Sequence, residues 1–444
     1  MQIIKISIIT TLLSSLLMAD NINDSNSSFG LDFEKKGAWT ALPYAFSSNS
    51  TGFSGGVGVI VQGLLQPYTT LVATLFGGTE QDILTNGEED TESFSGGFLA
   101  FHNLKVPYTN RLFFSTFGYK NTIPKQNLYF NGTNDSNQDD SAWVTSSDNS
   151  FATGTLTYVL PFGEGLDNPE NIYNIKDGFA MNREGYGNGT AFVTGRTTIG
   201  LTAFYQTQKI YNTENAMNPY DAPVEWNSDG VRVSLTHNNT DYNDNPSRGY
   251  SLFLQYSEDF GNGDNLDSWN SLEFKASKYF NLDTFSFTQQ NVLAFNFWTA
   301  YSFSWDVDNE VLPGIDAHQT PMWEGARLGG MNRMRGYDTN RFLDKAAIYG
   351  TVEYRAILDY NPIKNGDLGE WMAKNAPVDW FQLVAFAEVG RVNDTYNFEL
   401  LEDMKYDVGL SLRAMVAEMP VRLDVAYGEE GTNMWVMVQQ PFDF

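Results

Sequence analysis

Apolar and polar residues alternate along most of this chain, in segments separated by turns rich in Asn, Asp and Gly. In the segment 346–358 the even positions are mostly apolar, whereas the odd positions include Glu353 and Arg355. Successive side chains of a strand point to opposite faces, so each set lies on its own face. The segments 405–416 and 421–427 repeat the pattern. The sequence therefore predicts a chain built almost entirely of amphipathic β-strands.

Alternation of this kind fits two folds. In a soluble sandwich the apolar faces pack on each other, whereas in a membrane barrel they contact lipid and the polar faces line the lumen. The N-terminus favours the barrel, because residues 6–18 form an apolar run after Lys5, followed by Ala19 as a tolerable cleavage site. This pattern predicts a secretory signal peptide over 1–19. A membrane-anchoring helix is the alternative, but it would need about 20 apolar residues.

The composition changes the picture further. The chain of 444 residues has no cysteine, 15% aromatic residues, only 18% charged residues and a formal net charge of −27. No disulfide framework is possible, and the acidic charge argues against nucleic acid as a partner. The acidic residues gather in connectors, and none of these has the spacing of a defined calcium loop. We expect solvated surface loops at 85–92, 131–141, 238–245 and 261–268.

The C-terminal segment supports the barrel most directly. A final strand that ends in Phe is the usual assembly signal of Gram-negative barrel proteins, and here one face carries Met434, Val436, Val438, Phe442 and Phe444. We predict an all-β membrane barrel of about sixteen antiparallel strands, an even number as in most single-chain bacterial barrels. The candidate strands lie near 53–62, 67–77, 92–102, 110–119, 150–160, 190–195, 197–206, 230–238, 249–258, 271–280, 291–303, 346–358, 380–390, 405–416, 420–428 and 434–443.

One segment departs from the acidic character of the chain. The stretch GARLGGMNRMRGYDTNRF, residues 325–342, holds the four arginines Arg327, Arg333, Arg335 and Arg341. It is preceded by NPSRGYSLFL at 245–254 and followed in order by VEYRAIL, FAEVGRV, VRLDVAYG and QQPF. This series of motifs resembles the barrel domain of the BamA/TamA-type surface-antigen superfamily, which includes two-partner-secretion transporters. The resemblance is specific over 245–444 and general in character over 40–245.

The resemblance implies a particular role for the arginine segment. In that family the sixth extracellular loop carries a motif that matches Gly329, Gly330, Arg335, Gly336 and Tyr337 here. The loop folds back into the lumen, and its arginine contacts carboxylates on the inner wall. A long extracellular loop folded inward is therefore part of the predicted fold.

The strand phases supply acidic residues for that contact. Alternation places Glu388 and Asp424 on the lumen side, so we expect Arg335 to pair with Glu388 first and with Asp424 second. Guanidinium suits this role because it binds carboxylates in a bidentate, directional way. The family usually has Asp at the position of Glu388, so the reach differs slightly. In an alternative interpretation, Arg327 and Arg341 bind phosphates of lipopolysaccharide at the barrel rim.

The domain organisation follows from these assignments. We expect a signal peptide over 1–19, a polar tether with a short periplasmic or lumen-entering segment over 20–50, and the transmembrane barrel over 51–444. Relatives that assemble or secrete proteins carry periplasmic POTRA domains before the barrel, and some are fused to a patatin lipase. The stretch between Ala19 and Phe53 is too short for either, so a stand-alone barrel is expected.

A catalytic motif is present only in outline. Residues 52–56, GFSGG, match the Gly-x-Ser-x-Gly pattern around Ser54, but that nucleophile motif needs a strand–turn–helix context. Here the motif opens an alternating strand. The three histidines His102, His237 and His318 are scattered, so we expect no triad, no metal site, no cofactor and no enzyme activity.

The glycines of this region suggest a weak seam instead. Glycine weakens a strand because it has no side chain to pack. We expect the strand at 53–62, with Gly55, Gly56 and Gly58, to close the barrel against the last strand near 434–443, which contains Pro441. By the resemblance, this seam would open laterally.

Two functions from different classes remain open. The first is outer-membrane biogenesis or translocation of protein or lipid, with a separate periplasmic POTRA-type or chaperone partner. The second is a passive pore or structural membrane protein that has kept the scaffold and lost substrate handling. The expected surroundings are outer-membrane lipid and lipopolysaccharide. A homodimer is possible through the lipid-facing aromatics, but no sequence feature specifies one.

Overall fold

The computed structural model describes residues 39–442, except for 49–50, 67–68, 86–87, 130–131, 139–141, 173, 182, 184–186, 188, 212–223, 263–267, 305–319, 322, 364–376, 417–418 and 439. The predicted signal peptide, most of the predicted tether and Phe444 lie outside the described residues. Side chains are also not described for nearly all of the first strand or for Val438.

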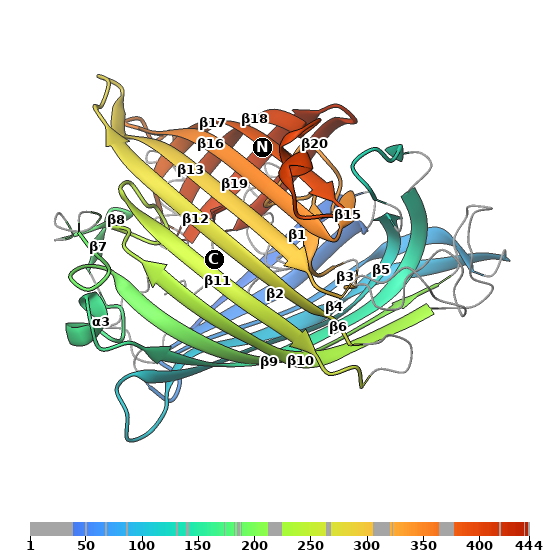
Figure 1. The fold of residues 1–444 in the computed structure, drawn as a ribbon, viewed down its shortest axis with the longest axis horizontal. Helices are drawn as coiled ribbons and strands as arrows, with labels where there is room; N and C mark the ends of the chain where they lie inside the picture. The colour runs from blue at the N-terminus through green and yellow to red at the C-terminus, as the bar shows by residue number, and fades with distance from the viewer. Residues whose placement is uncertain are drawn as a thin grey trace.

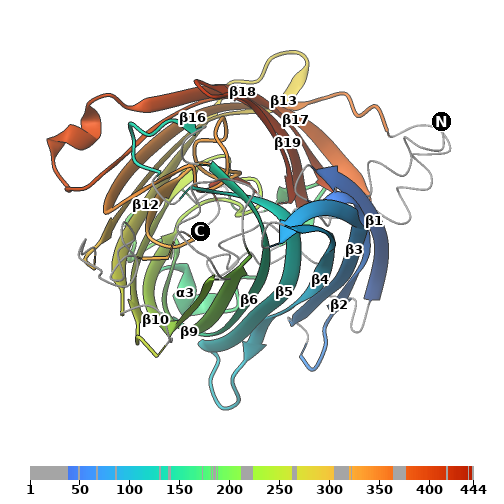
Figure 2. The same cartoon turned by 90° about the vertical axis from the view of Figure 1, so that its right-hand side faces the viewer.

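Sixteen strands form one continuous sheet in which every neighbouring pair is antiparallel. The sheet curls into a barrel wall of tilted strands (Figures 1 and 2). In order across the sheet the strands are β1 (Trp39–Ser48), β2 (Gly52–Gln62), β3 (Thr70–Thr85), β4 (Glu88–Lys105), β5 (Leu112–Tyr129), β6 (Ala142–Val159), β9 (Arg196–Ile210), β10 (Val224–Asn238), β11 (Gly249–Asp259), β12 (Asn270–Leu282), β13 (Thr288–Ser302), β16 (Ala346–Leu358), β17 (Val378–Asn393), β18 (Lys405–Val416), β19 (Met419–Gly428) and β20 (Gly431–Val438).

Two long connectors carry structure of their own. Between β13 and β16, the short strands β14 (Ala326–Leu328) and β15 (Phe342–Asp344) pair as a hairpin. Between β6 and β9 lie α3 (Glu164–Asp167) and a second hairpin of β7 (Ile175–Lys176) and β8 (Phe179–Ala180). Strand direction alternates along the sheet, so these two connectors lie at opposite ends of the barrel. The arginine segment marks the extracellular end, and α3 and β7–β8 therefore mark the periplasmic end. A 3₁₀ turn, η3 (Phe398–Leu401), lies in the β17–β18 connector.

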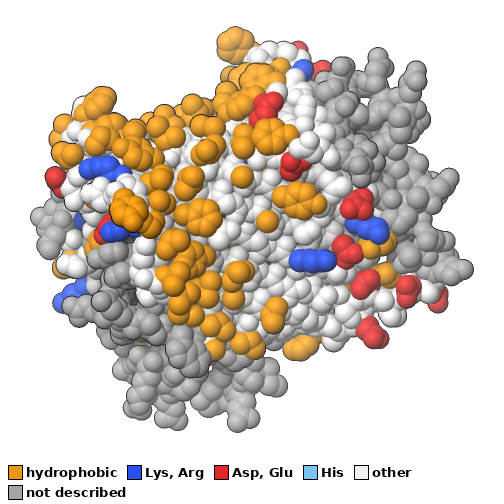
Figure 3. Space-filling view, turned by 90° about the horizontal axis from the view of Figure 1, so that it is seen from below, with side chains coloured by type: hydrophobic (Ala, Val, Ile, Leu, Met, Phe, Trp, Pro, Cys, Tyr) orange, Lys and Arg blue, Asp and Glu red, His pale blue; other side chains and the backbone are white. Residues whose placement is uncertain are grey.

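Burial follows the alternation that the sequence predicts. In β17, Gln382, Val384 and Glu388 are buried on the inner face, whereas Leu383 and Val389 are exposed on the outer face. Large apolar side chains lie on the outer wall, where Figure 3 shows hydrophobic groups spread over one face and most charged groups toward its ends. A soluble monomer does not expose apolar surface on this scale, so the outer face is the lipid-contacting face. Within the described residues, no helix has the length and apolar character to cross a bilayer.

Most predicted strands are confirmed. One strand was missed and one was predicted wrongly, so the predicted number of sixteen strands is still correct. The strand β1 was missed: its segment contains Pro43, which cannot donate to a ladder and which the structure accommodates in a strand at the edge of the sheet. The predicted strand at 190–195 is wrong, because these residues form turns in the β6–β9 connector. The barrel sheet accordingly begins at Trp39, and the expected domain boundary at residue 51 is wrong.

The periplasmic hairpin β7–β8 packs against the inside of the wall. Trp380 of β17 is buried with Tyr242, Ile357 and Met415, and the partly buried Phe179 of β8 lies against this cluster. The rings of Phe179 and Trp380 are 6.4 Å apart, and the Trp380 indole N–H donates to the carbonyl of Gly178 at 3.2 Å. One buried aromatic therefore ties the connector to the periplasmic mouth of the barrel.

We predict that Trp380→Ala releases this hairpin. Removing a fully buried Trp costs about 3–5 kcal/mol of unfolding free energy, through lost burial and the cavity left behind. The check is urea unfolding in lipid vesicles together with limited proteolysis, which should cut the 160–195 connector faster in the variant. Phe398→Ala, at a side chain 85% exposed, is the matched control and should change neither measurement. Equal protease resistance of Trp380→Ala and the parent would contradict the docking role.

Candidate functional site

The arginine segment between β13 and β16 folds into the lumen as a compact hairpin, here called the Arg335 loop (residues 326–344). Its turns need glycine, because Gly329 and Gly330 have φ angles of 105° and 112°. The Gly330 amide donates to the carbonyl of Tyr337 at 3.1 Å. Burial at the base of the loop raises the pKa of Asp344 to about 6.

Gly336 brings the loop against the barrel wall. A Cβ at this position would lie 2.6 Å from the Cβ of Asp407 and 2.8 Å from the amide nitrogen of Gly428, so only glycine fits. The amide of Gly336 donates to the Asp407 carboxylate at 3.0 Å. The next residue, Tyr337, is buried and donates its hydroxyl to the carbonyl of Tyr406 at 3.1 Å. The glycine motif therefore serves close approach between loop and wall.

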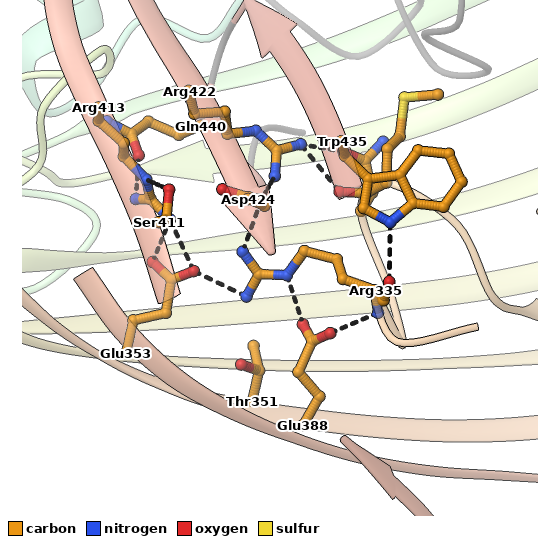
Figure 4. Close-up of polar contacts among 12 residues, drawn as sticks. Arg335, Thr351, Glu353, Glu388, Ser411, Arg413, Arg422, Asp424, Trp435 and Gln440 are labelled. Atoms are coloured by element: carbon orange, nitrogen blue, oxygen red, sulfur yellow. Dashed lines mark hydrogen bonds and ion pairs between the residues drawn. The ribbon is translucent and has the colours of Figure 1, made fainter. Parts of the chain in front are cut away.

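Arg335 lies fully buried among three carboxylates of the inner wall (Figure 4). Its Nε is 3.1 Å from Glu388, its Nη1 is 3.0 Å from Asp424 and its Nη2 is 2.9 Å from Glu353. The structure thus brings together Arg335 and both carboxylates predicted for it. All four side chains have no solvent exposure, or at most 1%. A charge buried to this degree persists only when it is paired and hydrogen-bonded.

Sequence reasoning missed Glu353, which is the most connected carboxylate of the group. Besides Arg335, it pairs with Arg355 at 2.8 Å and with Arg413 at 2.8 Å. Arg422 completes the set through an ion pair with Asp424. Glu353 lies on the polar face of an alternating segment, but alternation alone does not identify which polar residues contact Arg335. These seven residues, Arg335, Glu353, Arg355, Glu388, Arg413, Arg422 and Asp424, are here called the Arg335 cluster.

The backbone of the loop is also hydrogen-bonded to the barrel wall. The amide of Arg335 donates to the second oxygen of Glu388 at 2.6 Å. Its carbonyl accepts from the indole N–H of Trp435 in β20 at 2.7 Å (Figure 4). Arg422 donates to the carbonyl of Met331 at 2.9 Å. The loop is therefore tied to β17, β19 and β20, and the last of these is an edge strand of the sheet.

The other three arginines of the segment also contact the protein, and Arg327 and Arg341 are buried. Arg341 has no solvent exposure, pairs with Glu430 at 2.6 Å and donates to Ser136. Arg327 is 6% exposed and donates to Asn340 at 2.8 Å. Arg333 lies over the ring of Trp298, 3.9 Å from its centroid. The alternative in which Arg327 and Arg341 bind lipopolysaccharide at the rim is therefore wrong, because both guanidinium groups face the protein interior.

The C-terminal segment also turns into the lumen, contrary to the prediction of a continuous strand through residue 443. β20 ends at Val438, and Gln440 accepts from Arg413 at 2.5 Å while donating to the carbonyl of Asp244 at 3.0 Å. Phe442 is 3% exposed and lies 4.8 Å from the guanidinium of Arg355. The apolar face that the sequence assigned to one strand is therefore split between the wall and the interior.

The prediction that the glycine-rich strand at 53–62 closes the barrel is wrong. Gly55, Gly56 and Gly58 lie in β2, which pairs with β1 on one side and with β3 on the other. β2 is thus an interior strand, and the strands at the two ends of the hydrogen-bonded order are β1 and β20. Val436 lies on β20 as predicted. Ser54 is buried within β2 and donates to the carbonyl of Thr51, away from any strand–turn–helix context.

These features define the class of protein: an outer-membrane β-barrel with an extracellular loop folded inward on a buried arginine. A family model described as the Omp85 superfamily domain matches residues 138–442. The chain belongs to the Omp85 superfamily, which contains the BamA/TamA-type proteins that the sequence motifs resemble.

Solved structures of low sequence identity are also similar to the chain. BamA from Haemophilus ducreyi lacking POTRA domains 1–3 is 13% identical, with a TM-score of 0.48 over 91% of this chain and 70% of that one. CdiB from Acinetobacter baumannii is 12% identical, with a TM-score of 0.48 over 90% of this chain and 58% of that one. CdiB from Escherichia coli is 10% identical, with a TM-score of 0.48 and coverages of 90% and 61%. The chain thus spans less than two thirds of either CdiB. No curated protein matches the chain.

We predict that Arg335→Met lowers the unfolding free energy by about 3–5 kcal/mol, because it leaves three buried carboxylates without their shared cation. The measurement is urea unfolding in lipid vesicles, followed by the mobility shift between folded and unfolded barrel on gels. Lys405→Gln is the control, since its pair with Glu429 is partly exposed, at 25% and 43% of the two side chains, and should contribute at most about 1 kcal/mol. Similar losses in the two variants would rule out a special role for the buried pair.

We also predict that Glu353→Gln destabilises more than Glu388→Gln. Neutralising Glu353 weakens its contacts to Arg335, Arg355 and Arg413, whereas neutralising Glu388 affects Arg335 alone among the arginines of the cluster. The same unfolding assay ranks the two variants. If Glu388→Gln proves equally or more destabilising, Glu353 is not the centre of the cluster.

Proposed function

We propose that this protein acts in outer-membrane biogenesis or translocation of protein or lipid, as a barrel that is closed at rest and opens at its edge strands. The observation that carries the proposal is the Arg335 cluster. It holds the Arg335 loop inside the lumen with no solvent exposure of the central guanidinium. Superfamily membership supports this class of function.

A passive pore is the alternative, and the packing of the lumen speaks against it. Diffusion needs a continuous wet path lined by polar groups. Here Met334 and Tyr337 of the loop are buried against Trp298 and Tyr349 of the inner wall, in one apolar cluster. Phe442 and the β7–β8 hairpin occupy further parts of the interior. These contacts fill parts of the interior, and the proposal takes the barrel to be closed at rest, so that transport needs a conformational change.

The edge strands supply a place for that change. β20 has eight residues and is the shortest strand of the sheet, and β1 carries Pro43, which has no N–H to donate. A short edge with a missing donor pairs less strongly than an interior ladder. Trp435 links β20 directly to the carbonyl of Arg335. Movement of β20 would therefore break or strain the hydrogen bond between Trp435 and the Arg335 loop.

A periplasmic partner of the POTRA or chaperone type belongs to this proposal. Substrate must be delivered to the periplasmic mouth, where the β6–β9 connector docks through Trp380. The lipid and lipopolysaccharide of the outer membrane surround the wall. Capture of a POTRA-bearing protein by affinity purification of the full chain would support this part.

We predict that joining β1 to β20 abolishes function. Cysteine pairs, one at Ala41 or Ala45 in β1 and one at Thr432 or Met434 in β20, are screened for joining by a short bifunctional reagent, and no native thiol competes because the chain has no cysteine. In cells depleted of the parent protein, the joined variant should fail to restore the inventory of outer-membrane proteins and lipids. The same variant without the reagent should restore it.

The control joins two strands within the wall. Leu201→Cys and Val233→Cys lie opposite each other on β9 and β10, and a crosslink there should leave function intact. Full activity after complete β1–β20 crosslinking would eliminate edge opening. An unchanged inventory on depletion of the parent itself would favour the pore or structural alternative.

A further inference from the structure

A shallow groove of about 670 Å³ crosses the lipid-facing side of five neighbouring strands, β11, β12, β13, β16 and β17. It follows two adjacent rows of cross-strand neighbours on the outer face. One row is Tyr250, Lys278, Phe295, Val352 and Ala387, and the other is Leu252, Ala276, Phe297, Gly350 and Val389. Its volume falls within the roughly 300–1,000 Å³ of ligand sites.

Small residues create the hollow, and larger ones bound it. Ala276, Gly350 and Ala387 lie among Phe295 and Phe297, whose rings stand out from the wall. A Cβ added at Gly350 would meet no atom closer than 3.8 Å, so the space in front of this residue is open. The lining is almost wholly apolar, as an acyl chain requires.

The one charged residue of the groove is Lys278. Its ammonium lies 5.5 Å from the ring centroid of Tyr250 and 5.4 Å from that of Phe280, as a cation–π partner of each. Among the described residues, no carboxylate is within 4.0 Å of it. All other lining residues are uncharged, so this cation is available to a ligand that brings its own negative charge.

The position of Lys278 along β12 favours the periplasmic leaflet. It lies in the half of the strand that ends at Leu282, four residues before that end and on the side opposite the Arg335 loop. A lysine on the lipid face of a barrel is strongly destabilising at the midplane but only weakly so near the interface. Its long stem can extend toward the interface and place the ammonium at the level of lipid phosphates.

We propose that this groove binds a glycerophospholipid of the periplasmic leaflet, with an acyl chain along the hollow and the phosphate at Lys278. The site does not depend on the function proposed above, since it needs only the membrane barrel. A second copy of the chain fits less well. A two-fold contact places the same patch on both partners, so it would bring Lys278 toward its own symmetry mate.

The test is native mass spectrometry of the full chain in detergent, with added phosphatidylglycerol or with diacylglycerol of the same acyl chains. The parent should retain one phosphatidylglycerol. Gly350→Phe, which fills the hollow, should lose retention of both lipids. Lys278→Gln should weaken phosphatidylglycerol about tenfold, the size of one charge-assisted contact, and leave diacylglycerol unchanged.

Matched controls lie on the outer face of β9. Ala203→Phe adds the same kind of bulk, and Lys209→Gln removes the same charge, away from the groove; neither should alter retention. If Gly350→Phe does not fold, as judged by gel mobility, Ala276→Leu replaces it. Equal retention by the parent and the filled variant would overturn the site. A two-chain species lost on filling the groove would assign the groove to self-association instead.

Discussion

The structure depends on one buried guanidinium. Arg335 has no solvent exposure, and such a charge is stable inside a protein only if carboxylates and hydrogen-bond acceptors surround it. Three strands provide them, through Glu353 of β16, Glu388 of β17 and Asp424 of β19. Glu388 depends on the loop in turn, because Arg335 is its only arginine partner in the cluster, whereas Glu353 and Asp424 also pair with arginines of the wall. Loop and wall therefore specify each other.

This mutual dependence extends to the parts of the barrel that would have to move. The Arg335 carbonyl is bound by Trp435 of the edge strand β20, and Arg413 of the cluster is bound by Gln440 beyond that strand. An edge strand is paired on one side only, so its ladder is the least protected part of the sheet. The cluster thus connects the buried interior to a strand at the edge of the sheet.

The outer face obeys a different constraint. Lipid chains adapt to the shape of an apolar surface, so the outer face need not be closely packed. Small residues at Ala276, Gly350 and Ala387 leave a hollow there. A lysine is tolerated on that face only near the interface. The two faces of the same strand therefore meet different requirements. Polar side chains on the inner face must be paired, whereas the residues tolerated on the outer face depend on their depth in the bilayer. β16 contributes residues to both faces.

The sequence by itself determined the all-β class, the faces of the strands and the pairing of Arg335 with Glu388 and Asp424, because alternation is a local property and the loop motif is specific. It did not determine which strand stands at the edge: β1 contains Pro43 and resembles a connector until its pairing with β2 is known. The centrality of Glu353, the interior position of Arg341 and the inward turn of Phe442 were decided only by tertiary structure. The contacts that decide them join residues far apart in the chain, such as Glu353 with Arg413, Arg341 with Glu430 and Phe442 with Arg355. Alternation places Glu353 on the lumen side but does not identify these partners.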